Sequence, residues 1–181
     1  METHMENNKM LYSHVSVDCV LLGVNEDKLC VLLVERKIDK SDEKHYKLPG
    51  SLIFENEDLD TAAYRVFNEA TGLKRVPLKQ FRSFGSPSRT KNKDDMQWLE
   101  NAMKLKIERI VTVAYLALSK IGRKSNPTNK YNSLAWFPVD ALPSLPFDHK
   151  EIIEAAVEEI REWVEKEPSI IFDYLPLKFT A

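Results

Sequence analysis

Residues 47–73 constrain the fold of this chain more than any other stretch, because they predict a strand, a loop and a helix in immediate succession. The strand ends at Leu-Pro-Gly, and the helix runs from about residue 58 to residue 71. Asp58 or Asp60 can accept a hydrogen bond from the free amides at the helix start, and Gly72 is the residue type that ends a helix. The stretch therefore predicts both ends of its own helix.

The predicted helix has two faces. Apolar residues at spacings of three and four predict the face that packs on the core: Leu59, Ala62, Ala63 and Phe67. Val66, Glu69 and Ala70 stand at i, i+3 and i+4, so their side chains project together from a second face. That second face carries one carboxylate between two hydrocarbon side chains.

With this spacing the stretch resembles the signature of the Nudix hydrolase superfamily, G-x5-E-x7-R-E-U-x-E-E-x-G-U, in which U is apolar. Aligning Gly72 with the last signature glycine places Glu57 on the upstream glutamate, Arg65 on the arginine and Glu69 on the first of the paired glutamates. The resemblance covers about residues 12–181. It implies an α/β chain folded as the Nudix α/β/α sandwich with a mixed β-sheet.

Three signature positions depart from the family pattern. Ser51 replaces the first glycine, although Gly50 precedes it, and Val66 and Ala70 replace two glutamates of the helix. In the family those glutamates hold Mg²⁺ or Mn²⁺ against a diphosphate, and such hard cations require oxygen ligands. Glu69 remains as a weak metal ligand. We therefore expect a pocket that requires no cofactor, and Mg²⁺ or Mn²⁺ would be needed only by a hydrolase.

The remaining signature residues each have a second interpretation, so no catalytic residue is expected. Glu69 also fits a solvated helix carboxylate, and Arg65 fits a purely architectural ion-pair partner. Glu57 fits either an acid favoured by the helix dipole or a partner of Arg65. Whether the chain is an enzyme is left open by these residues, and the replacements at Val66 and Ala70 argue against it.

The resemblance also implies ligand-binding positions. A basic residue at the position of Arg36 often faces the ligand in Nudix folds, and residues 85–95 are similar to a Gly-Asp-Pro-x-Arg-Asp segment of ADP-ribose-handling members. Residues 109–118 are similar to a strand common in the same branch. Because guanidinium groups suit phosphate oxygens, Arg89 is the foremost candidate for a phosphate clamp, although a solvated loop arginine is the other interpretation. The expected ligand-binding residues are Arg36, Gly50, Ser51, Arg89 and Arg109.

The rest of the chain predicts further strands and one more long helix. Branched and aromatic residues predict strands at 14–22, 29–36, 78–84 and 109–118, and another within 133–143. Residues 23–28 read as a turn. Residues 151–165 predict a helix that buries one apolar face, with Asp148 as its cap.

Two features leave alternatives open. Asp18 stands within an otherwise apolar strand, so its carboxylate lies either at a sheet edge or in the pocket. Met96, Leu99, Met103 and Ile107 predict an amphipathic helix inserted in a loop. That helix could cover the pocket, contact a second subunit or pack on its own domain.

Residues 168–181 contain a Leu-Pro-x-x-Phe-Thr segment. It is similar to the junction that leads into a winged-helix DNA-binding domain in Nudix-related transcriptional regulators. We therefore divide the chain into a disordered or tag-derived start at 1–11, a Nudix domain at 12–167 and a junction at 168–181. The resemblance implies a homodimeric sensor whose DNA contact is made by a domain outside this chain, with ADP-ribose or a pentose as effector.

Composition and charge limit the partners and the cellular compartment that we expect for this chain. A net charge of −2 provides no strong field toward nucleic acid or membrane. Cys19 and Cys30 lie in apolar runs and read as reduced, buried thiols. No apolar run reaches the roughly 18 residues of a membrane span, and no leader precedes the domain, so we expect a cytoplasmic protein.

The leading hypothesis is a sensor that binds ADP-ribose or a related sugar or nucleotide without cleaving it. The alternative is a Mg²⁺-dependent hydrolase of ADP-ribose or another nucleoside diphosphate. A hydrolase would have to recruit metal ligands from outside the signature helix, and the available acids are Asp94, Asp95, Glu100 and Glu108. A third hypothesis is a scaffold with an empty pocket.

Overall fold

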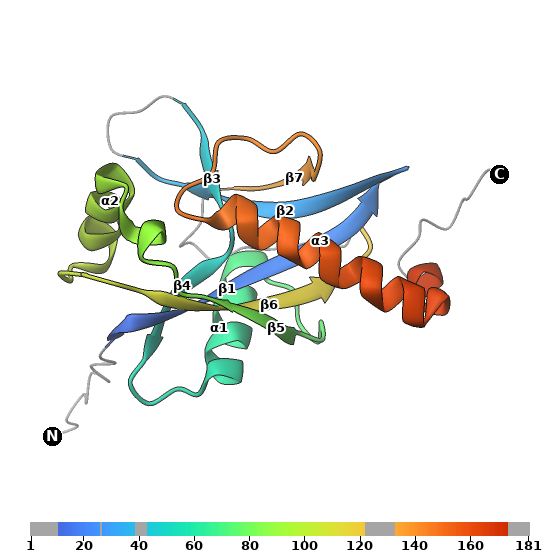
Figure 1. The fold of residues 1–181 in the computed structure, drawn as a ribbon, viewed down its shortest axis with the longest axis horizontal. Coiled ribbons are helices and arrows are strands. Elements are labelled where there is room, and N and C mark those ends of the chain that lie inside the picture. Colours follow the sequence, from blue (N-terminus) through green and yellow to red (C-terminus); the bar gives the residue numbers. More distant parts are fainter. Residues whose placement is uncertain (1–10, 26, 39–42, 122–132, 174–181) are drawn as a thin grey trace, which may run out of the picture.

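The computed structural model describes residues 11–25, 27–38, 43–121 and 133–173. Within these residues, strands form one seven-stranded sheet, and helices cover both of its faces (Figure 1). The strands are β1 (Leu11–Asn25), β2 (Lys28–Arg36), β3 (His45–Lys47), β4 (Gly50–Phe54), β5 (Lys79–Phe84), β6 (Val111–Leu118) and β7 (Leu134–Pro138). The helices are α1 (Leu59–Thr71), α2 (Lys93–Met103) and α3 (His149–Lys166), with short 3₁₀ helices η1 (Pro87–Thr90) and η2 (Pro168–Asp173).

The sheet is mixed and β1 lies at its centre. The strand order is β3-β2-β1-β6-β5, with β4 paired to β1 and β7 paired to β2. The β1–β6 pairing is parallel, whereas β1 pairs antiparallel with β2 and with β4. The α/β/α sandwich with a mixed sheet that the sequence predicts is therefore confirmed.

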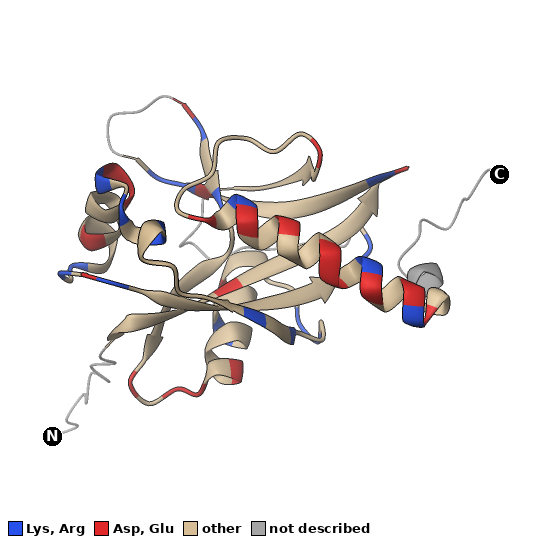
Figure 2. Ribbon diagram, in the orientation of Figure 1, with Lys and Arg blue, Asp and Glu red and all other residues tan. Residues whose placement is uncertain are grey.

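Alternation along β1 divides the core into two layers. Val17, Cys19 and Leu21 pack against α1 on one face, while Val20 and Leu22 pack against α3 on the other. Successive side chains of a strand point to opposite faces, which produces this division. The acidic residues of α3 lie on the side of the helix that faces away from the sheet (Figure 2).

Helix α1 forms where the sequence predicts it. Asp58 accepts a 2.7 Å hydrogen bond from the amide of Thr61 at its start. Gly72 adopts a left-handed conformation with φ of 67° at its end, and its amide donates to the carbonyl of Asn68 at 2.8 Å. Left-handed backbone is the conformation that favours glycine at this position. Local capping thus fixes both ends of the helix.

The structure also corrects several boundaries. Strand β1 continues through Gly23 to Asn25, so the expected turn at 23–28 is shorter than predicted. Helix α2 ends at Met103, and Ile107 packs beside it from the segment that follows. The expected disordered or tag-derived start lies almost entirely outside the described residues, as does the Leu-Pro-x-x-Phe-Thr segment.

Cys19 and Cys30 are free and buried, as expected. Burial raises the pKa of both thiols, and the neighbouring Asp18 adds to the effect at Cys19. None of the described helices combines the length and the hydropathy needed to cross a bilayer.

Candidate functional site

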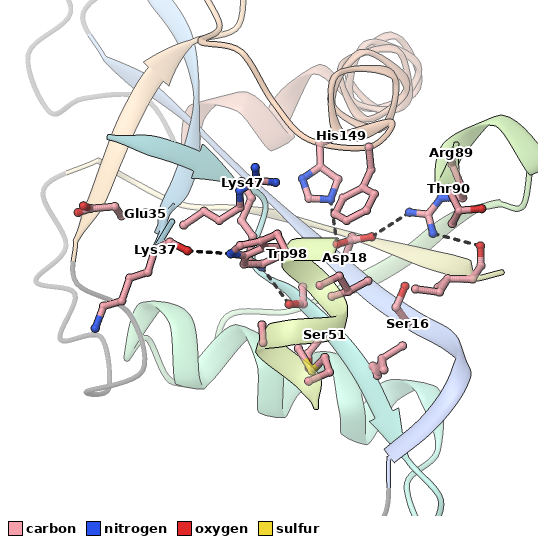
Figure 3. Close-up of a pocket in the computed structure, with 18 residues that line it drawn as sticks. Ser16, Asp18, Glu35, Lys37, Lys47, Ser51, Arg89, Thr90, Trp98 and His149 are labelled. Atoms are coloured by element: carbon pink, nitrogen blue, oxygen red, sulfur yellow. Dashed lines mark hydrogen bonds and ion pairs between the residues drawn. The ribbon is translucent and has the colours of Figure 1, made fainter. Parts of the chain in front are cut away.

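A cavity of about 270 Å³ lies over the central strand β1 and is bordered by α2 and the start of α3. Its floor is formed by β1 and β4, and its polar lining combines Asp18, Lys47, Arg89 and His149 (Figure 3). The opposite wall is apolar and comes mainly from α2. A concave, mostly apolar cavity with a few convergent polar groups is the usual form of a small-molecule site.

Helix α2 forms the roof of this cavity. Polar contacts hold the helix in this place on the rest of the domain. The indole of Trp98 donates to the carbonyl of Lys37 at 2.7 Å. Asp95 accepts from Arg36 at 2.7 Å and from the amide of Phe147 at 3.0 Å. Of the alternatives that the sequence leaves open for the inserted helix, the structure shows it both covering the pocket and packing on its own domain.

Arg36 lies between the roof and the cavity. Its guanidinium stacks on Trp98 at 4.8 Å from the ring centroid, in addition to its ion pair with Asp95. The Nε atom of Arg36 is buried, and no hydrogen-bond partner lies within reach of it among the described residues. A buried donor without a partner is costly, which is the pattern expected where a missing ligand or a rearrangement completes the site.

The floor of the cavity is organised by Asp18. Its carboxylate lies in the pocket and is 5% exposed, which decides between the two placements that the sequence leaves open. The hydroxyl of Thr112 donates to its Oδ2 atom at 2.6 Å. A Cβ atom on Gly50 would lie 2.0 Å from its Oδ1 atom, so the carboxylate occupies the space that a side chain at position 50 would need.

Arg89 lines the cavity, but its guanidinium is already bound within the protein. It donates to both carboxylate oxygens of Asp148, at 2.9 and 3.0 Å, and to the carbonyl of Ile110 at 3.2 Å. Asp18 lies 3.7 Å away and adds a second negative charge. Asp148 is the N-cap residue of α3, as expected, but its side chain makes no cap hydrogen bond because Arg89 holds the carboxylate instead.

His149 is the first residue of α3 and lies beside Asp18, with 3.6 Å between its Nε2 atom and Oδ1 of Asp18. Its Nδ1 atom accepts a hydrogen bond from the amide of Leu48 at 3.1 Å. Burial lowers the pKa of His149 to about 4, and the cations of Lys47 and Arg89 act in the same direction, against Asp18. The imidazole is therefore neutral at physiological pH.

The signature residues Glu57, Arg65 and Glu69 are not part of the cavity lining. Arg65 binds Glu57 at 2.5 and 2.9 Å and donates to the carbonyl of Leu52 at 3.2 Å, which ties α1 to β4. Glu69 lies 3.7 Å from Arg65. This geometry agrees with the architectural interpretation of Arg65 and with the pairing of Glu57 to it.

The residues present do not fit the metal site of the family. Val66 packs in the core with the apolar face of α1, and Ala70 packs against Val34 and Leu134. Within the described ranges, no three His, Cys, Asp or Glu side chains are grouped so as to hold a metal ion. The positions of the two missing glutamates are therefore filled by packed hydrocarbon.

The acids that a hydrolase would have to recruit are engaged or distant. Asp95 binds Arg36 and Phe147, and Glu100 accepts from the amide of Ile107 at 2.9 Å. Asp94 and Glu108 are exposed, and none of the four appears in the cavity lining.

The structure brings together four of the five expected ligand-binding residues. Arg36, Gly50, Ser51 and Arg89 all line the cavity. Arg109 does not, because its side chain donates to the carbonyl of Gly85 at 2.9 Å on the surface. Sequence reasoning missed Lys47, Trp98 and His149 as lining residues. A carboxylate within an apolar strand is the signal that pointed to Asp18.

Comparison with known proteins indicates the family to which the chain is similar. A family model described as NUDIX domain matches residues 12–158, and no curated protein matches the chain. Among solved structures, a MutT/nudix family protein from Enterococcus faecalis is similar at 25% identity and a TM-score of 0.66, with 94% of this chain and 69% of that chain covered.

The NUDIX domain of Shewanella oneidensis NrtR, complexed with ADP ribose, is similar at 25% identity and a TM-score of 0.61, with 82% of this chain and 89% of that domain covered. The chain covers 62% of the same protein in its complex with a 27mer DNA. An ADP-ribose pyrophosphatase from Streptococcus suis shares 18% identity at a TM-score of 0.54, with 83% and 93% coverage, which shows the fold alone.

Proposed function

This chain belongs to the Nudix family, and on that premise we propose that it binds ADP-ribose or a related sugar or nucleotide without hydrolysing it. The observation that carries the proposal is the packing of Val66 and Ala70. Both positions are buried against apolar neighbours, where the family holds its cation with carboxylates. A metal ion supplies several kcal/mol of charge stabilisation to such a reaction, and this helix offers no place for it.

The cavity supports binding in its own right. Arg36, Lys47 and Arg89 place positive charge around its lining, and Trp98 provides an aromatic wall. Arg36 contributes a guanidinium that is stacked, oriented and incompletely hydrogen-bonded. Guanidinium groups bind phosphate oxygens and aromatic faces well. We propose Arg36, Gly50 and Ser51 as ligand contacts, whereas the guanidinium of Arg89 would first have to leave Asp148.

We further propose that binding regulates transcription. The support is the similarity to Shewanella oneidensis NrtR, whose structures contain ADP ribose in one case and DNA in another. In this proposal residues 168–181 join the Nudix domain to a winged-helix domain that contacts DNA. The protein acts as a homodimer, and the effector shifts the dimer between two arrangements by binding them with different affinity.

The test measures binding and turnover together. The protein is titrated with ADP-ribose by calorimetry in Mg²⁺, in Mn²⁺ and in EDTA, and AMP release is followed in parallel. Binding that is equal in all three conditions, with no AMP released, is the expected result. Turnover of order one per second that EDTA abolishes would identify a hydrolase instead, and neither binding nor turnover would remove ADP-ribose as the ligand.

A pair of conservative variants sharpens the test. Arg36→Lys keeps the charge near Asp95 but loses the planar fork and the stack on Trp98. We expect it to weaken ADP-ribose binding about tenfold or more. Arg82→Lys makes the same chemical change on an exposed residue outside the cavity lining and should bind as the unmodified protein does.

A further inference from the structure

We propose that Asp18 and His149 form a donor–acceptor pair that recognises one hydroxyl group of the ligand, so that the cavity floor selects a sugar. The inference deepens the proposed function, on which it rests. It assigns the sugar end of the ligand to the floor and leaves any phosphate nearer to Arg36, toward the roof.

The geometry around Asp18 leaves one acceptor available. Its Oδ2 atom accepts from Thr112, whereas no donor in the described part of the chain lies within hydrogen-bond distance of Oδ1. The separation of 3.6 Å between Oδ1 and Nε2 of His149 is too long for a direct hydrogen bond. A ligand oxygen atom between them can lie at about 2.8 Å from both Oδ1 and Nε2, which is hydrogen-bond distance.

The ring of His149 is fixed in the state that donates from Nε2. Its Nδ1 atom accepts from the amide of Leu48, so the single proton of the neutral imidazole is on Nε2. Burial lowers the pKa of His149 to about 4 and keeps the ring neutral. The floor therefore presents one donor, from His149, beside one acceptor, from Asp18.

A hydroxyl fits this pair and a phosphate does not. A hydroxyl donates and accepts at the same oxygen, whereas an ionised phosphate only accepts and would be repelled by the carboxylate of Asp18. Arg89 offers no compensating fork, because Asp148 takes two of its donors and Ile110 a third.

The contact of Asp18 with Gly50 holds the acceptor at the cavity surface. The carboxylate lies over the Cα atom of Gly50, where a Cβ would approach Oδ1 to 2.0 Å. Gly50 itself lines the cavity. If Asp18 served only to pair with His149 or Arg89, we would expect a direct hydrogen bond to one of them. Instead, Nε2 of His149 lies 3.6 Å from Asp18, and the guanidinium of Arg89 lies 3.7 Å from it.

Two substitutions of His149 separate the proposed role from folding. The amide oxygen of Asn can replace Nδ1 and keep the bond to Leu48, so His149→Asn removes the Nε2 donor alone. The amide of Gln reaches the position of Nε2 instead, so His149→Gln keeps a donor there and loses the bond to Leu48. His149→Asn should be the more stable variant and the worse binder of sugar.

The experiment compares ADP-ribose with ADP, which lacks the second ribose, by calorimetry on the full chain. The unmodified protein should prefer ADP-ribose, and His149→Asn should reduce that preference about tenfold while its affinity for ADP stays unchanged. His149→Gln should retain more of the preference. If folded His149→Asn keeps the whole preference, the hydroxyl role is overturned and the proposed function stands.

Failure of the proposed function gives a different result. If the unmodified protein does not bind ADP-ribose, it is titrated with the free sugars ribose, arabinose and xylose. Binding of one of them that His149→Asn abolishes supports the pair without the nucleotide. Absence of binding to all of these sugars overturns the inference together with the nucleotide proposal.

Discussion

Arg36 and Asp95 are 59 residues apart in the chain and form a 2.7 Å ion pair that holds α2 over the cavity. Asp95 also accepts from the amide of Phe147, so one carboxylate connects α2, β2 and the segment before α3. The ion pair is nearly enclosed, with side-chain exposures of 9% and 11%. Asp95 is therefore a central polar contact of the roof, beside the hydrogen bond from Trp98 to Lys37.

Asp95→Asn should destabilise the protein by about 3 kcal/mol, because it leaves the guanidinium of Arg36 enclosed without its carboxylate. Hydrogen exchange of the α2 amides should accelerate more than exchange in the sheet. Asp94→Asn removes the same charge from the same helical turn at an exposed site, and should change the free energy of unfolding by less than about 0.5 kcal/mol. Equal effects of the two variants would contradict the special role of Asp95.

Gly50→Ala should destabilise the protein by about 2 kcal/mol or more and weaken ligand binding, because the new Cβ would displace the carboxylate of Asp18 from Thr112. Urea denaturation and calorimetry measure the two effects. Gly85→Ala is the matched control, since its Cβ would meet only the side chain of Val111, at 3.3 Å. A Gly50→Ala variant as stable as Gly85→Ala would show that Asp18 does not lie against position 50.

Ala70→Glu should destabilise the protein by about 3 kcal/mol or more and should not restore Mg²⁺ binding. The sequence pattern alone suggests that a glutamate here would rebuild the metal site, but Ala70 is fully buried beside Val34 and Leu134. A carboxylate in this place lacks both room and partners. Thermal unfolding with and without Mg²⁺ tests the prediction, and a marked rise in melting temperature with Mg²⁺ would refute it.

The free energy of unfolding should decrease as the pH is lowered from about 6.5 to about 4, because of His149. Its pKa is near 4 in the folded protein, whereas the ordinary pKa of histidine, which the unfolded chain retains, is 6.5. The unfolded state therefore binds more protons in this window, so the free energy of unfolding decreases as the pH is lowered, by up to about 3 kcal/mol. His149→Asn should remove this part of the pH dependence, and an unchanged profile in that variant would exclude His149 as its source.

Local features of the fold could be predicted because their causes are local. The start and end of α1 depend on Asp58 and Gly72, which act on amides and carbonyls a few residues away. The strands follow from runs of branched residues, and the replacement of metal ligands follows from identity at Val66 and Ala70. Each of these inferences needed only neighbouring positions.

The candidate site could be predicted only in part, because its contacts join distant segments. Asp148 has the sequence position of a helix cap, yet its side chain binds Arg89 from 59 residues earlier in the chain. The same contact occupies the guanidinium that the sequence suggested for phosphate. Trp98 reaches the cavity because α2 packs beside the end of β2, where the indole donates to the carbonyl of Lys37. No spacing within the sequence reports such pairings.

Residues 85–109, which include α2, form a segment whose two ends are joined by a hydrogen bond at the edge of the sheet. Arg109 donates to the carbonyl of Gly85 at 2.9 Å, and these residues lie next to the neighbouring strands β6 and β5. A segment closed at its base in this way can be lengthened, shortened or replaced with little disturbance to the strands that flank it. Related chains can therefore differ in the roof of the cavity while the strands beneath it stay as they are.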